Sequence, residues 1–167
     1  MSTALDAPPG TLDRPEQAFV DAVREHGWFR TQVAADHEGP GFSFSTGFWT
    51  TTKQPDLLLF SMRSDIAHDV FWDLYRHAQQ GQTLPIGRST NEVFANLPAY
   101  LFPIAKRHYP DYVGWSRWFY GGDEFPCLQI VWPDREGVFP WQDGFDPAFV
   151  GDQIDLTEAG WNAEVRQ

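Results

Sequence analysis

Cysteine is almost absent from this chain, which has Cys127 as its one thiol among 167 residues. A single cysteine cannot form a disulfide within the chain, so a small scaffold held together by disulfides is excluded. No apolar run approaches the roughly 18 residues that a membrane-spanning helix requires, and the N-terminal sequence MSTALDAPPG has no targeting pattern. We therefore expect a soluble cytoplasmic protein with no membrane partner.

Basic residues are also scarce. Lysine and arginine number 12 against 23 acidic residues, and the formal net charge is -11. Such a chain repels phosphate backbones, which makes nucleic acid a poor partner. Its field favours a basic protein partner, although acidity that serves solubility alone would produce the same composition.

Aromatic residues, in contrast, are abundant: the chain has 8 tryptophans and 14 phenylalanines, and hydrophobic residues make up 42%. This length and composition suit one domain with a substantial core. We expect this domain over residues 13–150. A flexible N-terminal arm over residues 1–12 precedes it, and a polar tail without a clear period, residues 151–167, follows it.

Three helices are predicted from capping signals and 3.6-residue periodicity. Asp13 and Glu16 form a capping-box pattern that opens a helix over 14–26. The most regular pattern begins at Ser64 and ends before Gly81. A third helix, rich in aromatic residues, is predicted from Pro110 to the Gly121–Gly122 pair.

The remaining apolar runs predict strands. Two strands joined by a Gly-Pro-Gly turn indicate an antiparallel hairpin. DLLLF is apolar throughout, which is typical of a strand buried on both faces. The fold class is therefore α+β, a mostly antiparallel sheet with about three helices packed against one face. The predicted strands cover residues 28–36, 42–49, 56–60, 99–104 and 125–132, with 138–141 as a strand returning from the PDREG turn.

The strand over residues 42–49 alternates rings with small residues. Phe42, Phe44, Thr46 and Phe48 would share one face, and Ser43, Ser45, Gly47 and Trp49 the other. The small face has two explanations. It admits close packing of a helix or loop, which we favour, or it forms a small-molecule or cofactor pocket at Ser43, Ser45 and Gly47 with His37 or His68 nearby.

No catalytic or metal-binding constellation is evident. The histidines form no H-x-x-x-H or H-x-H pair, and His68 and His77 would lie on opposite sides of one helix. Cys127 sits in an apolar strand, where a thiol behaves as a small hydrophobe. The glycine-rich loops of nucleotide sites are missing. We predict no metal, no cofactor and no catalytic residues, and we do not expect an enzyme.

Two surface features suggest protein binding. Asp65, Asp69 and Asp73 recur every four residues, which places like charges along one helix face at a cost of a few tenths of a kcal/mol per pair. This stripe is either a solvated face or a docking site for a basic partner. Trp115 and Trp118 lie on one flank of the third helix, as core residues or as interface anchors.

Several segments in a fixed order resemble the bacterial domain-of-unknown-function family 4262, from Glu25 to Phe145. They are EHGWFRTQVAADHEGPGFSFSTGFW, QPDLLLFSM and FYGGDEFPCLQIVWPDREGVFPW. The resemblance implies a cytoplasmic bacterial protein and implies no activity. The family usually reads Tyr, Thr and Leu where this chain has Phe44, Ser45 and Phe48.

Two functional hypotheses follow. The first is an acidic protein-binding module, such as an immunity or antitoxin protein that neutralises a basic toxin by direct binding through Asp65, Asp69, Asp73, Trp115 and Trp118. The alternative is a small-molecule or cofactor-binding protein, including an enzyme, with its pocket along Phe42–Trp49. A homodimer that buries exposed rings is a further possibility.

Overall fold

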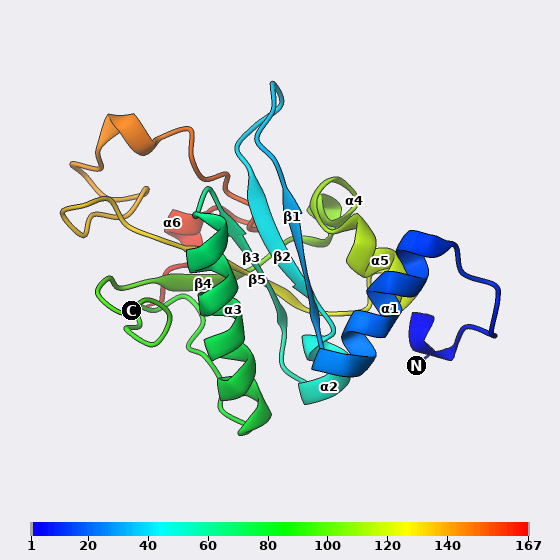
Figure 1. Cartoon of the computed structure of the whole chain (residues 1–167). Helices are drawn as coiled ribbons and strands as arrows, with labels where there is room; N and C mark the ends of the chain where they lie inside the picture. Colours follow the sequence, from blue (N-terminus) through cyan, green and yellow to red (C-terminus); the bar gives the residue numbers. More distant parts are fainter. Residues whose placement is uncertain (1, 167) are drawn as a thin grey trace.

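The computed structural model describes residues 2–166, which form a five-stranded sheet in the order β1-β2-β3-β5-β4 (Figure 1). β3 and β5 run parallel, and every other neighbouring pair is antiparallel. The predicted α+β class and the predicted hairpin are therefore confirmed. The strands are β1 (Phe29–Val33), β2 (Phe42–Thr46), β3 (Asp56–Phe60), β4 (Tyr100–Pro103) and β5 (Cys127–Val131).

Helices cover both faces of this sheet, so the expectation of helices against one face was wrong. Leu57 and Leu59 of β3 pack with α3, whereas Leu58 and Phe60 pack with α1, α4 and α5. Because β3 is apolar on both sides, each side needs a cover. The helices are α1 (Arg14–His26), α2 (Phe48–Thr52), α3 (Ser64–Gln79), α4 (Tyr109–Tyr112), α5 (Gly114–Tyr120) and α6 (Trp161–Glu164), with short 3-10 helices η1 (Ala4–Asp6), η2 (Lys106–His108) and η3 (Pro147–Phe149).

The capping signals located α1 correctly. Asp13 accepts a hydrogen bond from the backbone of Glu16, and the Glu16 side chain accepts one from the backbone of Asp13. Gly27 ends the helix with a φ of 89°, in the left-handed region. α3 buries its predicted apolar side and keeps its aspartates in solvent.

The predicted strand over 42–49 is shorter than expected. β2 ends at Thr46, Gly47 adopts a φ of 113°, and Phe48 begins α2. A side chain at position 47 would collide with the backbone of Gly27 and Trp28, because a Cβ there would lie 2.7 Å from the Gly27 carbonyl oxygen. Because of this turn, Phe44 and Phe48 do not share one face of the sheet as predicted. Phe44 packs on the α5 side, whereas Phe48 packs on the α3 side.

Two further predictions were wrong. The third helix is two helices, α4 and α5, separated at Val113, whose φ of -121° and ψ of 45° are not helical. Residues 138–141 are not a strand. The Asp134 carboxylate accepts hydrogen bonds from the backbone of Glu136 and Val138, which holds a compact loop in place of a returning strand.

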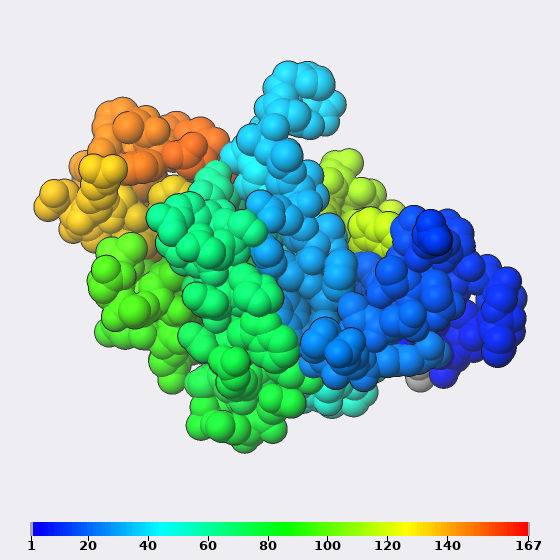
Figure 2. Space-filling view, in the orientation of Figure 1, coloured from blue at the N-terminus to red at the C-terminus, as the bar shows by residue number. Residues whose placement is uncertain are grey.

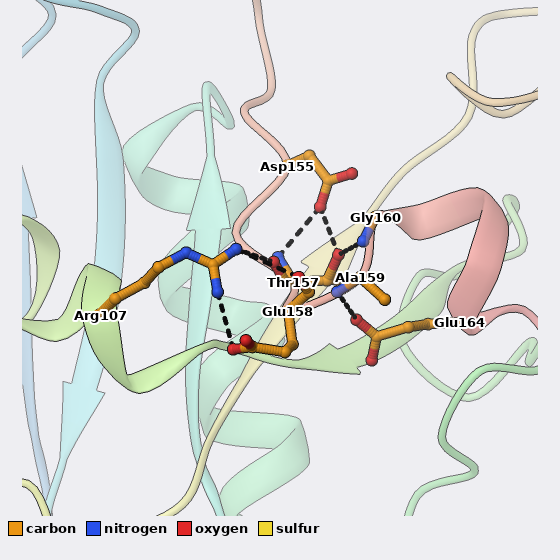
Figure 3. A network of polar contacts seen from close by, with 7 residues as sticks. All are labelled: Arg107, Asp155, Thr157, Glu158, Ala159, Gly160 and Glu164. Carbon is orange, nitrogen blue, oxygen red and sulfur yellow. Dashed lines mark hydrogen bonds and ion pairs between the residues drawn. The ribbon is translucent and has the colours of Figure 1, made fainter.

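The polar tail is part of the folded domain. Gln129 of β5 donates to the carbonyl of Ile154 at 2.6 Å and accepts from the backbone of Leu156 at 3.2 Å, and Leu156 is fully buried. Arg107 binds the carbonyls of Thr157 and Glu158 and forms an ion pair with the Glu158 carboxylate at 2.7 Å (Figure 3). The sequence of the tail has no hydrophobic periodicity because these polar contacts, and not a repeating apolar face, attach it to the sheet.

The N-terminal segment contains a short helix that contacts the core. Residues 4–6 form η1, whose Ala4 and Leu5 pack against the α1 and α5 side of the core. The Arg24 guanidinium donates a hydrogen bond to the carbonyl of Leu5 at 2.8 Å.

Candidate binding sites

A buried carboxylate lies at the junction of β3, α2 and α5. Asp56 has no solvent exposure, and its Oδ1 accepts hydrogen bonds from the Ser45 hydroxyl at 2.8 Å and from the Phe48 backbone at 3.0 Å. The Tyr120 hydroxyl donates to Oδ2 at 2.5 Å. Asp56 therefore caps the N-terminus of α2, a role that Gly47 at the N-cap position has no side chain to fill.

The burial of Asp56 raises its pKa to about 6, while the hydrogen bonds from Tyr120, Ser45 and the Phe48 and Trp49 backbone oppose that rise. Burial also raises the pKa of Tyr120, and the nearby Asp56 charge adds to the effect. The phenol therefore keeps its proton and acts as the donor. These groups have protein partners on every side, which is typical of a structural network.

The residues proposed for a pocket along β2 belong to this same packed region. Ser45 donates to Asp56 and accepts from the backbone of Leu57 at 3.0 Å, and Ser43 accepts from Arg30 at 3.3 Å. Gly47 lies against the backbone of Gly27 and Trp28. These contacts favour the packing explanation for the small residues.

The two histidines suggested for that pocket lie apart from one another. His37 is in the exposed hairpin loop, with Glu38 4.0 Å away. His68 lies on α3 with its ring near Trp28 and Trp72. Across residues 2–166, no three His, Cys, Asp or Glu side chains are placed to hold a metal ion. Burial raises the pKa of Cys127, so its thiol is poorly suited to ionise.

The aspartate stripe lies exposed on α3, as its spacing predicts. Two of its three charges have partners: Arg63 lies 2.7 Å from Asp65, and Arg76 lies 3.0 Å from Asp73. The hydrogen bond from Arg63 lowers the pKa of Asp65. The stripe is therefore less negative than its sequence suggests.

The tryptophan pair lies on the opposite layer. Trp115 stacks on Phe19 of α1 with ring centroids 5.1 Å apart, and Trp118 meets Phe19 edge-on at 5.8 Å. Trp115 keeps 36% of its surface exposed, whereas Trp118 is half-buried. Because α3 and α5 cover opposite faces of the sheet, the five predicted residues do not form one surface.

Trp115 borders a hollow of about 530 Å³ between the β1–β2 hairpin and the α4–α5 segment. In Figure 1 the hairpin extends beyond the rest of the sheet beside α4, and Figure 2 shows a notch between its tip and the yellow-green α4–α5 surface. Thr31, Val33, Phe42 and Phe44 form the floor. We call this site the hairpin hollow; its other lining residues are Ala34, Asp36, Glu38, Gly39, Pro40, Asp111, Tyr112, Gly114, Trp115 and Ile154.

The hairpin hollow is acidic and aromatic. Three carboxylate residues, Asp36, Glu38 and Asp111, are among those lining it, and none of its lining residues is a lysine or arginine. The Thr31 hydroxyl on its floor is buried and has no hydrogen-bond partner within the described residues. The sequence alone did not indicate this site, because Asp111 is about 75 positions away from Asp36 and Glu38. The signal was present only as two separate acidic loops beside aromatic residues.

Comparisons with known proteins give a family without an assigned role. A model of the family described as "Domain of unknown function (DUF4262)" matches residues 22–146, which confirms the resemblance noted from the sequence. No curated protein and no solved structure matches the chain. Among residues 2–166, no helix is both long and apolar enough to cross a membrane.

Proposed function

Because the chain belongs to the DUF4262 family, whose function is unknown, we propose its function from the site: it is an acidic protein-binding module that receives a basic segment of a partner in the hairpin hollow. The partner would be a basic protein of the toxin-like kind that immunity and antitoxin proteins neutralise by direct binding. The observation that carries this proposal is the lining of the hollow, which combines three carboxylate residues with exposed ring surface and contains no basic side chain.

The chemistry of the hollow suits an arginine or lysine side chain. A cation close to the face of an aromatic ring gains about 0.5–2 kcal/mol, and Tyr112 and Trp115 supply rings at the rim. Neighbouring carboxylates add charge-assisted hydrogen bonds. The net charge of -11 speeds association with such a partner.

The location of binding can be tested with two matched triple variants. Asp36→Asn, Glu38→Gln and Asp111→Asn neutralise the hollow, whereas Asp65→Asn, Asp69→Asn and Asp73→Asn neutralise the α3 stripe. Each set removes three negative charges and preserves side-chain shape. The probe is a nine-residue glycine-serine peptide with three arginines, titrated calorimetrically at low salt. The same peptide with citrulline in place of arginine is the neutral control.

We expect saturable binding of the arginine peptide, a loss of at least about tenfold in the hollow variant, and a change of less than about threefold in the stripe variant. Equal losses in both variants would show that only the overall field matters. Equal binding of the citrulline peptide would contradict recognition of a cation. A basic protein encoded beside this chain is the first full-length partner to examine in the same assay.

A further inference from the structure

A second cavity, of about 220 Å³, lies on the other layer of the molecule, beneath the C-terminal half of α3. It is bounded by the start of α2, the beginnings of β3 and β5, and the loop over residues 82–86. Eight of its twelve lining residues are apolar. The apolar lining residues are Phe48, Pro55, Leu57, Leu74, Ala78, Leu84, Ile86 and Leu128.

A few polar groups mark the edge of this cavity. They are His77, Gln54, Gln82 and Thr83. The His77 ring is largely buried and lies 3.6 Å from the Glu92 carboxylate. Gln54 is half-buried and Gln82 is exposed, and their side-chain amides can pair with a bound molecule at this edge. An apolar cavity with a few convergent polar groups is the usual form of a small-molecule site.

The size of the cavity limits what it can hold. An apolar cavity of about 150 Å³ in a protein stays dry and accepts benzene. The present cavity is larger by about one further ring, which corresponds to a bicyclic aromatic molecule. Glu92 beside His77 and the net charge of -11 disfavour an anion, and the hydrocarbon walls disfavour any charged group.

We infer that this cavity binds a neutral aromatic molecule of about the size of indole, whose one hydrogen-bonding group faces His77, Gln54 or Gln82. The site has no residue in common with the hairpin hollow and does not depend on the proposed function. It differs from the pocket anticipated along β2, because it contains Phe48 but none of Ser43, Ser45 and Gly47.

The test uses 5-fluoroindole and fluorine NMR on the full chain, because the 8 tryptophans obscure a fluorescence signal. Ala78→Phe fills the cavity from α3, and Leu84→Trp fills it from the loop over residues 82–86 should the first variant fail to fold. Ala18→Phe makes the same change as Ala78→Phe on an exposed position of α1 and serves as the control. Indole-3-carboxylate, as an anion, tests the preference for neutral ligands.

We expect a saturable shift of the fluorine resonance with wild type and Ala18→Phe, and at least tenfold weaker binding in each folded cavity variant. Displacement by indole-3-carboxylate should need at least tenfold more ligand than displacement by indole. Neutralising the hairpin hollow should leave the affinity unchanged. No saturable shift up to the solubility limit of the probe, or wild-type affinity in the folded cavity variants, would overturn the inference.

Discussion

The Tyr120 hydroxyl donates a 2.5 Å hydrogen bond to Oδ2 of Asp56 and accepts one of 2.9 Å from the backbone of Gly47. One phenol therefore joins α5 to β3 and to the turn that opens α2. Because Asp56 also accepts from Ser45 and Phe48, four segments of the chain meet at one buried carboxylate. Phe48, whose backbone donates to Asp56, also lines the cavity beneath α3.

Tyr120→Phe should destabilise the fold. The substitution removes the one hydrogen bond from Tyr120 to the buried Asp56 and the one that the Gly47 backbone donates to Tyr120, and losing a hydrogen bond to a charged group costs about 1.5–3 kcal/mol. Urea unfolding measures the loss. Tyr112→Phe, at a half-buried tyrosine on α4, is the matched control and should change stability by less than about 0.5 kcal/mol. Equal effects at the two tyrosines would contradict the role of the junction.

Asp56 should make stability fall as the pH rises from about 4 to about 6. Burial raises the pKa of the folded carboxyl to about 6 from its ordinary 3.8, so the folded state binds this proton more tightly than the unfolded chain does. The stability that the bound proton contributes is complete below the pKa of Asp56 in the unfolded chain and is lost as the pH rises through its pKa in the folded protein. At about 1.4 kcal/mol per pKa unit, the free energy of unfolding falls by about 3 kcal/mol.

The pH dependence of Asp56 is isolated as the difference between wild type and Asp56→Asn in urea unfolding across that range. A parallel pH profile for Asp56→Asn and wild type would contradict the assignment.

Asp134 should change the free energy of unfolding with the opposite sign and over a different pH range. Its burial would raise its pKa, but hydrogen bonds from the backbone of Val138, Asp146 and Glu136 lower it. Its contribution to stability is therefore lost only as the pH falls below about 4.

Gly47→Ala should be costly because two effects combine. The φ of 113° is unfavourable for any residue with a Cβ, and that Cβ would lie 2.9 Å from Cα of Trp28. We expect a loss of more than about 2 kcal/mol in thermal or urea unfolding. Gly144→Ala, with a φ of 88° and open space around it, isolates the backbone effect and should cost about 1 kcal/mol. A smaller loss at position 47 than at 144 would disprove close packing there.

Gln129→Leu should release the C-terminal tail from the sheet. The leucine cannot pair with the Ile154 carbonyl or the Leu156 backbone N–H, and each unsatisfied buried group costs about 1–3 kcal/mol. Hydrogen exchange at the Leu156 amide should accelerate together with the loss of stability. Glu158→Ala, which removes an exposed ion pair with Arg107, should cost less than about 1 kcal/mol. Unchanged protection of Leu156 in Gln129→Leu would show that other contacts hold the tail.

Local patterns were enough to predict some elements of this fold and not others. The helix over 14–26 was predicted from its capping box and its periodicity, and the helix beginning at Ser64 from its periodicity alone, since no side chain caps α3. Both signals act over a few neighbouring positions. The strand over 42–49 was predicted too long because its turn depends on contact between Gly47 and the backbone of Gly27. That contact is not visible in the alternation of rings and small residues.

The candidate sites depended even more on tertiary structure. The spacing of Asp65, Asp69 and Asp73 predicted an exposed stripe, but the arginines that pair with its two ends could not be assigned from spacing alone. Trp115 was recognised as an interface candidate. Its acidic neighbours in the hairpin hollow come from the hairpin loop and from Asp111, and only the folded sheet brings them together.

The sequence by itself determined the α+β class, the two amphipathic helices, the apolar strands β3 and β5, and the net charge of -11, because each follows from composition or from neighbouring residues. Only the tertiary structure decided that Asp56 meets Tyr120, that the polar tail is held by Gln129, and that two cavities lie on opposite layers. These features join segments more than 20 residues apart, and packing, not local conformational preference, brings such segments together.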